Sequence, residues 1–284
     1  MPYFDQHSLY EDWQHTHQLA LDAARAAGNL RGQAVMLRGL GQIRLYRDDY
    51  AAATEAFDQA LELSRQARDK REEFLATGGL ATIDRMLGRY DKSEAHIRQA
   101  LDIAIATDDP HFEAQFRNAL GMVLLAQGLT DQAHVSFDQA LELCRNLGDS
   151  HREAVVLREA SLLYDRIGQT DRALASLRRA QEIFDSIDDE RCLAYTQLRT
   201  GRVHTAHHNR PQATTEIQHA IAFFARNGNR MEEAECWQLL ADLDVHHQDL
   251  PTARRRLARA LQLWRSIGAT QQAAETQERL DRLH

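Results

Sequence analysis

Five histidines in the last third of the chain have spacings that metal sites use. His204, His207 and His208 stand at positions i, i+3 and i+4 of one segment, and His246 and His247 follow further along. Side chains at these spacings share one face of a helix, so their imidazoles can converge on one ion. The same residues fall near expected turns, where a solvated polar side chain is ordinary. The sequence leaves both interpretations open, and we predict no bound metal or cofactor.

Paired carboxylates also have types suited to chemistry, because two neighbouring acids can act as general acid and base. The pairs are Asp48-Asp49, Asp108-Asp109 and Asp188-Asp189. They recur where turns and helix caps are expected, so position accounts for them. No pattern supports a Ser-His-Asp or Cys-His arrangement. We therefore expect a protein that is not an enzyme.

Charge and composition exclude several other classes of protein. The 284 residues carry a formal net charge of −8, whereas proteins that coat nucleic acid need excess cations. A basic run at 254–256 has no interleaved aromatic residues, which favours a solvated helix face over a nucleic-acid contact. No apolar run approaches the roughly 20 residues of a membrane span. Three widely separated cysteines indicate reduced thiols. We expect a cytoplasmic protein that binds neither nucleic acid nor membrane.

A repeat of 40 residues organises the chain. The segment FDQALEL occurs at 57–63 and again at 137–143. Its alanine belongs to a series with constant spacing: Ala60, Ala100, Ala140, Ala180, Ala220 and Ala260. Internal similarity at such a period is the signature of a solenoid, in which repeats stack on their neighbours.

Each repeat is predicted to form two helices that approach closely. Apolar residues recur at helical spacing on both sides of a central turn. One position of the first helix is always small, which indicates that the second helix lies close to it. Its residues are Gly41, Ala81, Gly121, Ser161, Gly201 and Ala241. Asn or Asp precedes each first helix and is expected to cap it. These caps are Asn29, Asp69, Asp109, Asp149, Asp189 and Asn229.

The order of these motifs resembles the tetratricopeptide repeat (TPR) family. The first repeat shows it as Leu40-Gly41, Ala53-x3-Phe57 and Ala60-Leu61-Glu62-Leu63, and the third as Leu120-Gly121, Ala133-x3-Phe137 and Ala140 to Leu143. The common TPR period is 34 residues, so this is a longer format. The resemblance implies an all-α, right-handed TPR superhelix, an α-solenoid of antiparallel helix pairs with about fourteen helices.

The start of the chain has a narrower resemblance. The segment WQHTHQLALDAARAAGNLRGQA at 13–34 is similar to the entry into the C-terminal TPR region of large actinobacterial antibiotic regulatory proteins of the SARP class. Those regulators carry a DNA-binding domain and an NB-ARC/STAND nucleotide-binding switch domain before their TPRs. No phosphate-binding GxxxxGK[ST] motif occurs here. The resemblance implies the sensor part of such a regulator, whose upstream domains would be partners if the chain is a fragment.

The family resemblance also implies where a partner binds, namely in a concave groove lined by the first helices. Carried over position by position, the groove residues are Arg38, Gln42, Tyr46, Arg85, Met86, Asn118, Met122, Arg158, Leu162, Arg166, Tyr195 and Arg202. Arginines beside an apolar floor suit a peptide or protein segment, with acidic groups as one possibility. The alternative is that these arginines are solvated or paired with neighbouring acids.

The N-terminal helix is expected at 10–28 without a partner helix before it. Phe4, Tyr10 and Trp13 would then present an uncovered apolar surface, so we name them as a candidate for self-association. A free-standing adaptor that scaffolds partners or forms a homodimer is the alternative to a regulator's sensor.

We predict a single array over 1–284. It comprises the N-terminal helix 10–28, six repeats at 30–69, 70–109, 110–149, 150–189, 190–229 and 230–269, and a capping helix at 270–284. The predicted function is non-catalytic recognition of a peptide or protein segment in bacterial signalling or transcription regulation. The sequence does not identify the ligand.

Overall fold

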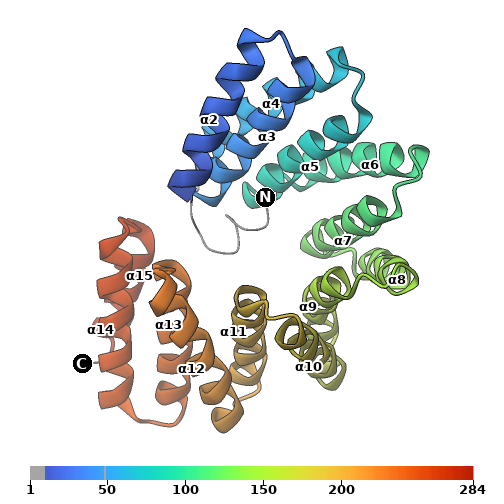
Figure 1. Ribbon diagram of the computed structural model, residues 1–284. Helices are drawn as coiled ribbons and strands as arrows, with labels where there is room; N and C mark the ends of the chain where they lie inside the picture. The colour runs from blue at the N-terminus through green and yellow to red at the C-terminus, as the bar shows by residue number, and fades with distance from the viewer. Residues whose placement is uncertain (1–9, 48, 284) are drawn as a thin grey trace. The chain divides into compact units, whose positions relative to one another are not determined.

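The computed structural model describes residues 10–47 and 49–283, and these form α-helices joined by short turns (Figure 1). This confirms the predicted all-α class. The helices in chain order are α2 (Tyr10–Ala26), α3 (Leu30–Tyr46), α4 (Tyr50–Gln66), α5 (Lys70–Met86), α6 (Tyr90–Ala106), α7 (Pro110–Ala126), α8 (Thr130–Asn146), α9 (Ser150–Arg166), α10 (Thr170–Ser186), α11 (Glu190–Ala206), α12 (Arg210–Asn227), α13 (Arg230–His246), α14 (Leu250–Ser266) and α15 (Thr270–Asp281).

The helices belong to two compact units, Met1–Leu163 and Tyr164–His284. In each unit, consecutive helices pack against one another as antiparallel pairs, in the manner of an α-solenoid (Figure 1). In unit 1, α3 also contacts α5, and in unit 2, α11 also contacts α13. The first helices of successive repeats therefore lie side by side within each unit, and their side chains form a common face. We call this the first-helix face.

The helix ends repeat one geometry even where the residue type changes. Gly148 follows α8 in the left-handed conformation with a φ of 65°, and Asp108 adopts a φ of 52° at the equivalent place after α6. A residue other than glycine costs roughly 1–2 kcal/mol there, so stacking of the repeats imposes the turn.

Most of the predicted N-caps form. Their side chains accept a hydrogen bond from the backbone N–H three residues further on, as for Asn29, Asp69, Asp109, Asp149 and Asp189. Asn229 also occupies the predicted N-cap position, of α13, but its side chain does not make that bond.

The small residues of the first helices mark close contacts with aromatic or branched side chains. A Cβ on Gly121 would lie 2.8 Å from Cε1 of Phe137, and one on Gly201 would lie 2.4 Å from Cγ1 of Ile217. Phe57 is held from two sides, by Gly41 of its own repeat and by Gly79 of the next. The repeated FDQALEL segment therefore supplies a stacking residue, Phe57 or Phe137, that is almost fully buried.

The N-terminal helix buries the side chain that we expected to be exposed. Trp13 is only 4% exposed and packs with Leu21, Leu37 and Leu40 in one apolar cluster. The reason is that α2 lies against α3 in the way that a second helix lies against the next first helix. Phe4 and the side chain of Tyr10 lie outside the described residues, so self-association through them stays a prediction.

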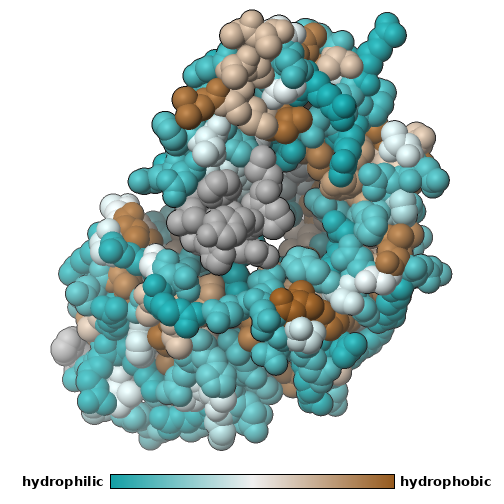
Figure 2. Space-filling view, in the orientation of Figure 1, coloured by the Kyte–Doolittle hydropathy of each residue, from teal (hydrophilic) through white to brown (hydrophobic). Residues whose placement is uncertain are grey.

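The face of the molecule shown in Figure 2 is mainly hydrophilic. On the face shown in Figure 2, hydrophobic residues form small separate patches between polar ones. Exposed apolar side chains such as Ile105 and Val135 occur on different helices. Among the described helices, none has the length and apolar character that crossing a bilayer requires. A binding site is therefore best sought in a pocket.

The contact between Gly79 and Phe57 predicts a stability effect. A Cβ at position 79 would lie 2.3–2.6 Å from three atoms of the buried ring of Phe57. We expect Gly79→Ala to lower the unfolding free energy by about 1–2 kcal/mol, although alanine is intrinsically the better helix former. Chemical denaturation measures the effect. A smaller side chain at position 57 should relieve the clash. The double variant with Phe57→Leu should therefore lose less unfolding free energy than the sum of the losses in the two single variants. Simple additivity would contradict the contact.

The buried His17 predicts a dependence of stability on pH. Its Nε2 accepts a hydrogen bond from Nε1 of Trp13 at 3.1 Å, and its Nδ1 lies 3.0 Å from the carbonyl oxygen of Trp13, so one neutral tautomer satisfies both contacts. Burial lowers the pKa of His17, and the nearby charge of Arg38 acts in the same direction. The unfolded chain therefore takes up this proton first, and stability falls as pH drops below about 6.5.

Thermal unfolding of the wild type and of His17→Leu at pH 7.5 and pH 5.5 tests this. The variant should be less stable at pH 7.5, because Trp13 loses its acceptor. It should then lose less stability than the wild type on acidification. An equal loss in both proteins would show that other groups account for the pH dependence.

Candidate functional site

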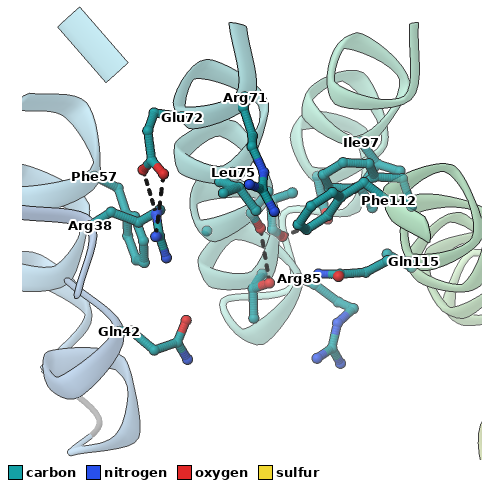
Figure 3. A pocket seen from close by; sticks show the side chains of 17 residues that line it. Arg38, Gln42, Phe57, Arg71, Glu72, Leu75, Arg85, Ile97, Phe112 and Gln115 are labelled. Atoms are coloured by element: carbon teal, nitrogen blue, oxygen red, sulfur yellow. Dashed lines mark hydrogen bonds and ion pairs between the residues drawn. The ribbon is translucent and has the colours of Figure 1, made fainter. Parts of the chain in front are cut away.

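A pocket of about 520 Å³ opens on the first-helix face of unit 1. Its main walls come from α3, α5 and α7, the first helices of three successive repeats (Figure 3). The lining includes Arg38 and Gln42 from α3, Arg71, Glu72, Leu75, Gly78, Thr82 and Arg85 from α5, and Phe112, Gln115, Phe116 and Ala119 from α7. The volume lies within the range of known ligand sites, roughly 300–1,000 Å³.

One face of α5 runs along the whole pocket. Arg71, Leu75, Gly78, Thr82 and Arg85 follow one another at intervals of three or four residues, so they share that face. The hydroxyl of Thr82 donates to the carbonyl oxygen of Gly78 at 3.0 Å and is therefore already engaged. The stripe is apolar and open at its centre, with an arginine near each end.

The charge of Arg38 is already balanced within the pocket. Its Nε donates to Oε2 of Glu72 at 2.7 Å, and its Nη2 lies 3.4 Å from Oε1 (Figure 3). Glu72 is buried, which strengthens the attraction between the two charges. The pair links α3 to α5 and fixes one wall. Arg38 thus lines the pocket, but its charge is used to hold α3 and α5 together.

Arg71 departs from a contact that its counterparts make. In the repeats on either side, the basic residue in this position pairs with the capping Asp of the following repeat, as Arg31 does with Asp69 at 2.6 Å and His111 with Asp149 at 3.1 Å. The guanidinium of Arg71 instead lies over the ring of Phe112, 5.4 Å from its centroid. Within residues 10–47 and 49–283, neither Arg71 nor Arg85 has a carboxylate partner. The pocket thus has two uncompensated cations.

Three of the residues predicted for the groove line this pocket: Arg38, Gln42 and Arg85. The other predicted residues in unit 1 lie outside it. Tyr46 and Met86 are exposed near helix ends, and Arg158 pairs with Glu159 at 3.0 Å. The remaining three in unit 1 are the partly buried Asn118, Met122 and Leu162.

In unit 2 the predicted residues are mostly engaged with the neighbouring first helix. The hydroxyl of Tyr195 donates to Glu232 at 2.6 Å, and Arg202 forms an ion pair with Glu235. Burial raises the pKa of Glu235, while the charge of Arg202 opposes that rise. The third predicted residue, Arg166, is exposed. The first-helix face of unit 2 thus carries internal charge pairs, which was the alternative interpretation for its arginines.

Sequence reasoning missed Arg71, Phe112 and Phe116 as lining residues. One signal was present: positions 31, 71, 111, 151 and 191 are all cations or histidines. That series belongs to contacts between repeats, and only the structure shows that Arg71 leaves it.

The histidines of unit 2 do not converge on one point. The rings of His208 and His246 stack with centroids 3.7 Å apart and planes at 4°. His207 points elsewhere, with Nε2 3.1 Å from Asp165 and 3.0 Å from the hydroxyl of Thr170. Of the residues that the structure describes, no three ligand atoms from this group come together as a metal site requires.

Comparisons with known proteins agree with this architecture. Residues 72–146 and 112–186 match a family model described as Tetratricopeptide repeat. A search of curated proteins gives no match. BtubC (BKLC) from P. vanneervenii is 22% identical, with 76% of this chain and 91% of that chain covered and a TM-score of 0.60. A Rap protein solved with competence and sporulation factor is 15% identical, with 93% and 78% covered and a TM-score of 0.69.

A third similar structure is a longer protein. It is a Signal Transduction ATPase with Numerous Domains (STAND) from Pyrococcus horikoshii that has a tetratricopeptide repeat sensor. The identity is 13% and the TM-score 0.70, and the match covers 93% of this chain but only 42% of that one. At these identities the likeness shows the fold. Residues 72–186 therefore match the tetratricopeptide repeat family, and the chain has the fold of a TPR-type α-solenoid.

Proposed function

We propose that this chain is a non-catalytic recognition module that binds a peptide or protein segment on the first-helix face of unit 1. The observation that carries the proposal is the pocket between α3, α5 and α7, with two arginines that have no carboxylate partner among the described residues beside an aromatic wall. Arginine binds carboxylates through two parallel hydrogen bonds, and aromatic side chains bind apolar groups. The pocket thus offers both kinds of contact to one ligand.

The lining supports binding rather than catalysis. Arginine stays protonated and has no acceptor, so Arg71 and Arg85 cannot serve as a base. Glu72 is held by Arg38, and the hydroxyl of Thr82 is turned toward a backbone carbonyl. Such a lining supplies charge and shape, without a nucleophile poised beside a proton acceptor.

The proposal extends to the sensing part of a cytoplasmic bacterial regulator. Two similar structures motivate it: the Rap protein was solved with competence and sporulation factor, and the STAND protein carries its tetratricopeptide repeats as a sensor. In this scheme, nucleotide-binding and DNA-binding domains would lie upstream, and the bound segment would change their contacts with the repeats. Three buried cysteines without disulfides suit a reducing compartment.

The alternative is a free-standing adaptor that forms a homodimer through its first helix. Burial of Trp13 removes the main apolar side chain that such a dimer would use. The adaptor role therefore has less support than the sensor role.

Reversing the charge of Arg85 tests the proposed function. Peptides selected from a random library on the wild-type protein should bind Arg85→Glu at least about tenfold more weakly, because a charge-assisted contact becomes a repulsion. Fluorescence anisotropy measures binding, and circular dichroism checks that helicity is unchanged. The matched control is Arg98→Glu on α6, outside the pocket, which should retain binding. A library that yields no binders, or binders insensitive to Arg85, would contradict the proposal.

Removing the acid of the pocket should have the opposite effect. Glu72→Gln leaves the charge of Arg38 uncompensated, so the pocket becomes more cationic. We expect acidic peptides from the same library to bind several-fold more tightly at low salt, with the gain shrinking as salt rises. Titrations at two ionic strengths measure it. Unchanged or weaker binding would show that Glu72 itself contacts the ligand or that ligands bind elsewhere.

A further inference from the structure

One position of the pocket lining lacks a side chain. Aligned at the 40-residue period, the residues equivalent to Gly78 are Arg38, Asn118, Arg158, Leu198 and Gln238. Each of these carries a side chain that reaches beyond Cβ, whereas position 78 leaves bare helix backbone as part of the pocket lining. Glycine inside a helix costs about 1 kcal/mol relative to alanine, so the opening has an energetic cost.

Aromatic rings complete this open centre. A Cβ on Gly78 would lie 2.8 Å from Cε1 of Phe116, so that ring edge comes up against the glycine. Phe116 is 2% exposed and packs against Phe74, with centroids 5.7 Å apart, and Phe74 packs in turn against Phe112 at 4.8 Å. Rings held in this way change position little, so the pocket has a preformed apolar wall where the Phe116 ring lies against Gly78. We call the part of the pocket bounded by this wall the socket.

The two free cations lie symmetrically about this socket. Arg71 precedes Gly78 by seven residues and Arg85 follows it by seven. At 1.5 Å per helical residue, each arginine is therefore based about 10 Å along α5 from the socket. An extended peptide covers that distance in about three residues. Gln42 on α3 and Gln115 on α7 line the pocket from opposite walls, and their amides can both donate to and accept from a peptide backbone (Figure 3).

We propose that the pocket selects an extended peptide segment in which one apolar side chain enters the socket over Gly78 and acidic residues about three positions before and after it pair with Arg71 and Arg85. The proposal rests on the proposed function and specifies the chemistry of its ligand. Gly78 is then the residue that determines specificity. Recognition is then centred on the second repeat, the one that has glycine where the other repeats have a larger side chain.

Synthetic peptides of about seven residues test this spacing. The main probe has glutamate at both ends, leucine in the centre and serine elsewhere, with capped termini and a rhodamine label. One comparison peptide has glutamine for both glutamates, a second has alanine for leucine, and a third has both glutamates next to the leucine. We expect the main probe to bind about tenfold or more tighter than each of them in fluorescence anisotropy.

Variants of the protein test the socket itself. Gly78→Leu should weaken binding of the main probe at least tenfold, because the new side chain displaces the Phe116 ring that forms the socket wall. Since this change disturbs a buried ring, Ala119→Leu is a second variant, which fills the pocket from α7. Arg98→Leu on α6 is the matched control, because it places the same side chain outside the pocket. It should retain binding, as should Arg98→Gln, whereas Arg71→Gln and Arg85→Gln should weaken it.

Equal affinity for all four peptides, or full binding by both folded leucine variants in the pocket, would overturn the proposal. The library-selected peptides separate this failure from that of the proposed function. If they bind and depend on Arg85 while the designed probe fails, only the socket assignment is wrong. If no peptide of either kind binds, the recognition function is wrong as well.

Discussion

Close packing between the two helices of a repeat is the constraint on which the rest of the structure depends. Phe57 and Phe137 fit against positions where the neighbouring helix carries only glycine, and Ile217 does the same against Gly201. A methyl group on Gly121 or Gly201 would meet a buried side chain at less than 3 Å, and one on Gly41 would meet Phe57 at 3.1 Å. Because this contact fixes how each pair is rotated, it also fixes which residues of the first helix face outward. Function can then vary on that face without changing the stack.

The helices, the 40-residue period and most caps could be predicted from sequence, since they depend on local spacing and on residue types that recur in every repeat. Whether each arginine is paired with a carboxylate could not be predicted in this way. Arg38 is balanced by Glu72, which lies 34 residues away in sequence, and Arg202 by Glu235, at a separation of 33. Such pairing depends on which side chains the stack brings together. For the same reason, the burial of Trp13 was missed, because Leu37 and Leu40, which pack against it, lie on the following helix.

Contacts between repeats show why Arg71 was overlooked. Its position in the series is that of a structural basic residue, which in neighbouring repeats pairs with the capping Asp of the next repeat. A residue that follows a structural pattern in sequence looks like part of the scaffold. Phe112 provides a different partner for the guanidinium, and its position is Gly32 in the first repeat and Glu72 in the second. Arg71 in the second repeat and Phe112 in the third thus form a contact with each other in place of the usual pair with a capping Asp. This contact becomes part of the pocket wall.

The overall charge makes the free arginines more informative. The chain has 42 acidic residues against 34 lysines and arginines, so carboxylates are in excess. Under that excess, arginines on this fold are readily neutralised, as Arg38 and Arg202 are. Arg71 and Arg85 escape because the lining near them is built from phenylalanine, leucine, glycine, glutamine and threonine, and its one acid is held by Arg38. Because no carboxylate of the described residues neutralises these two arginines, they remain able to attract carboxylates of a ligand. The same lining leaves an apolar centre, so charge and shape favour one kind of ligand.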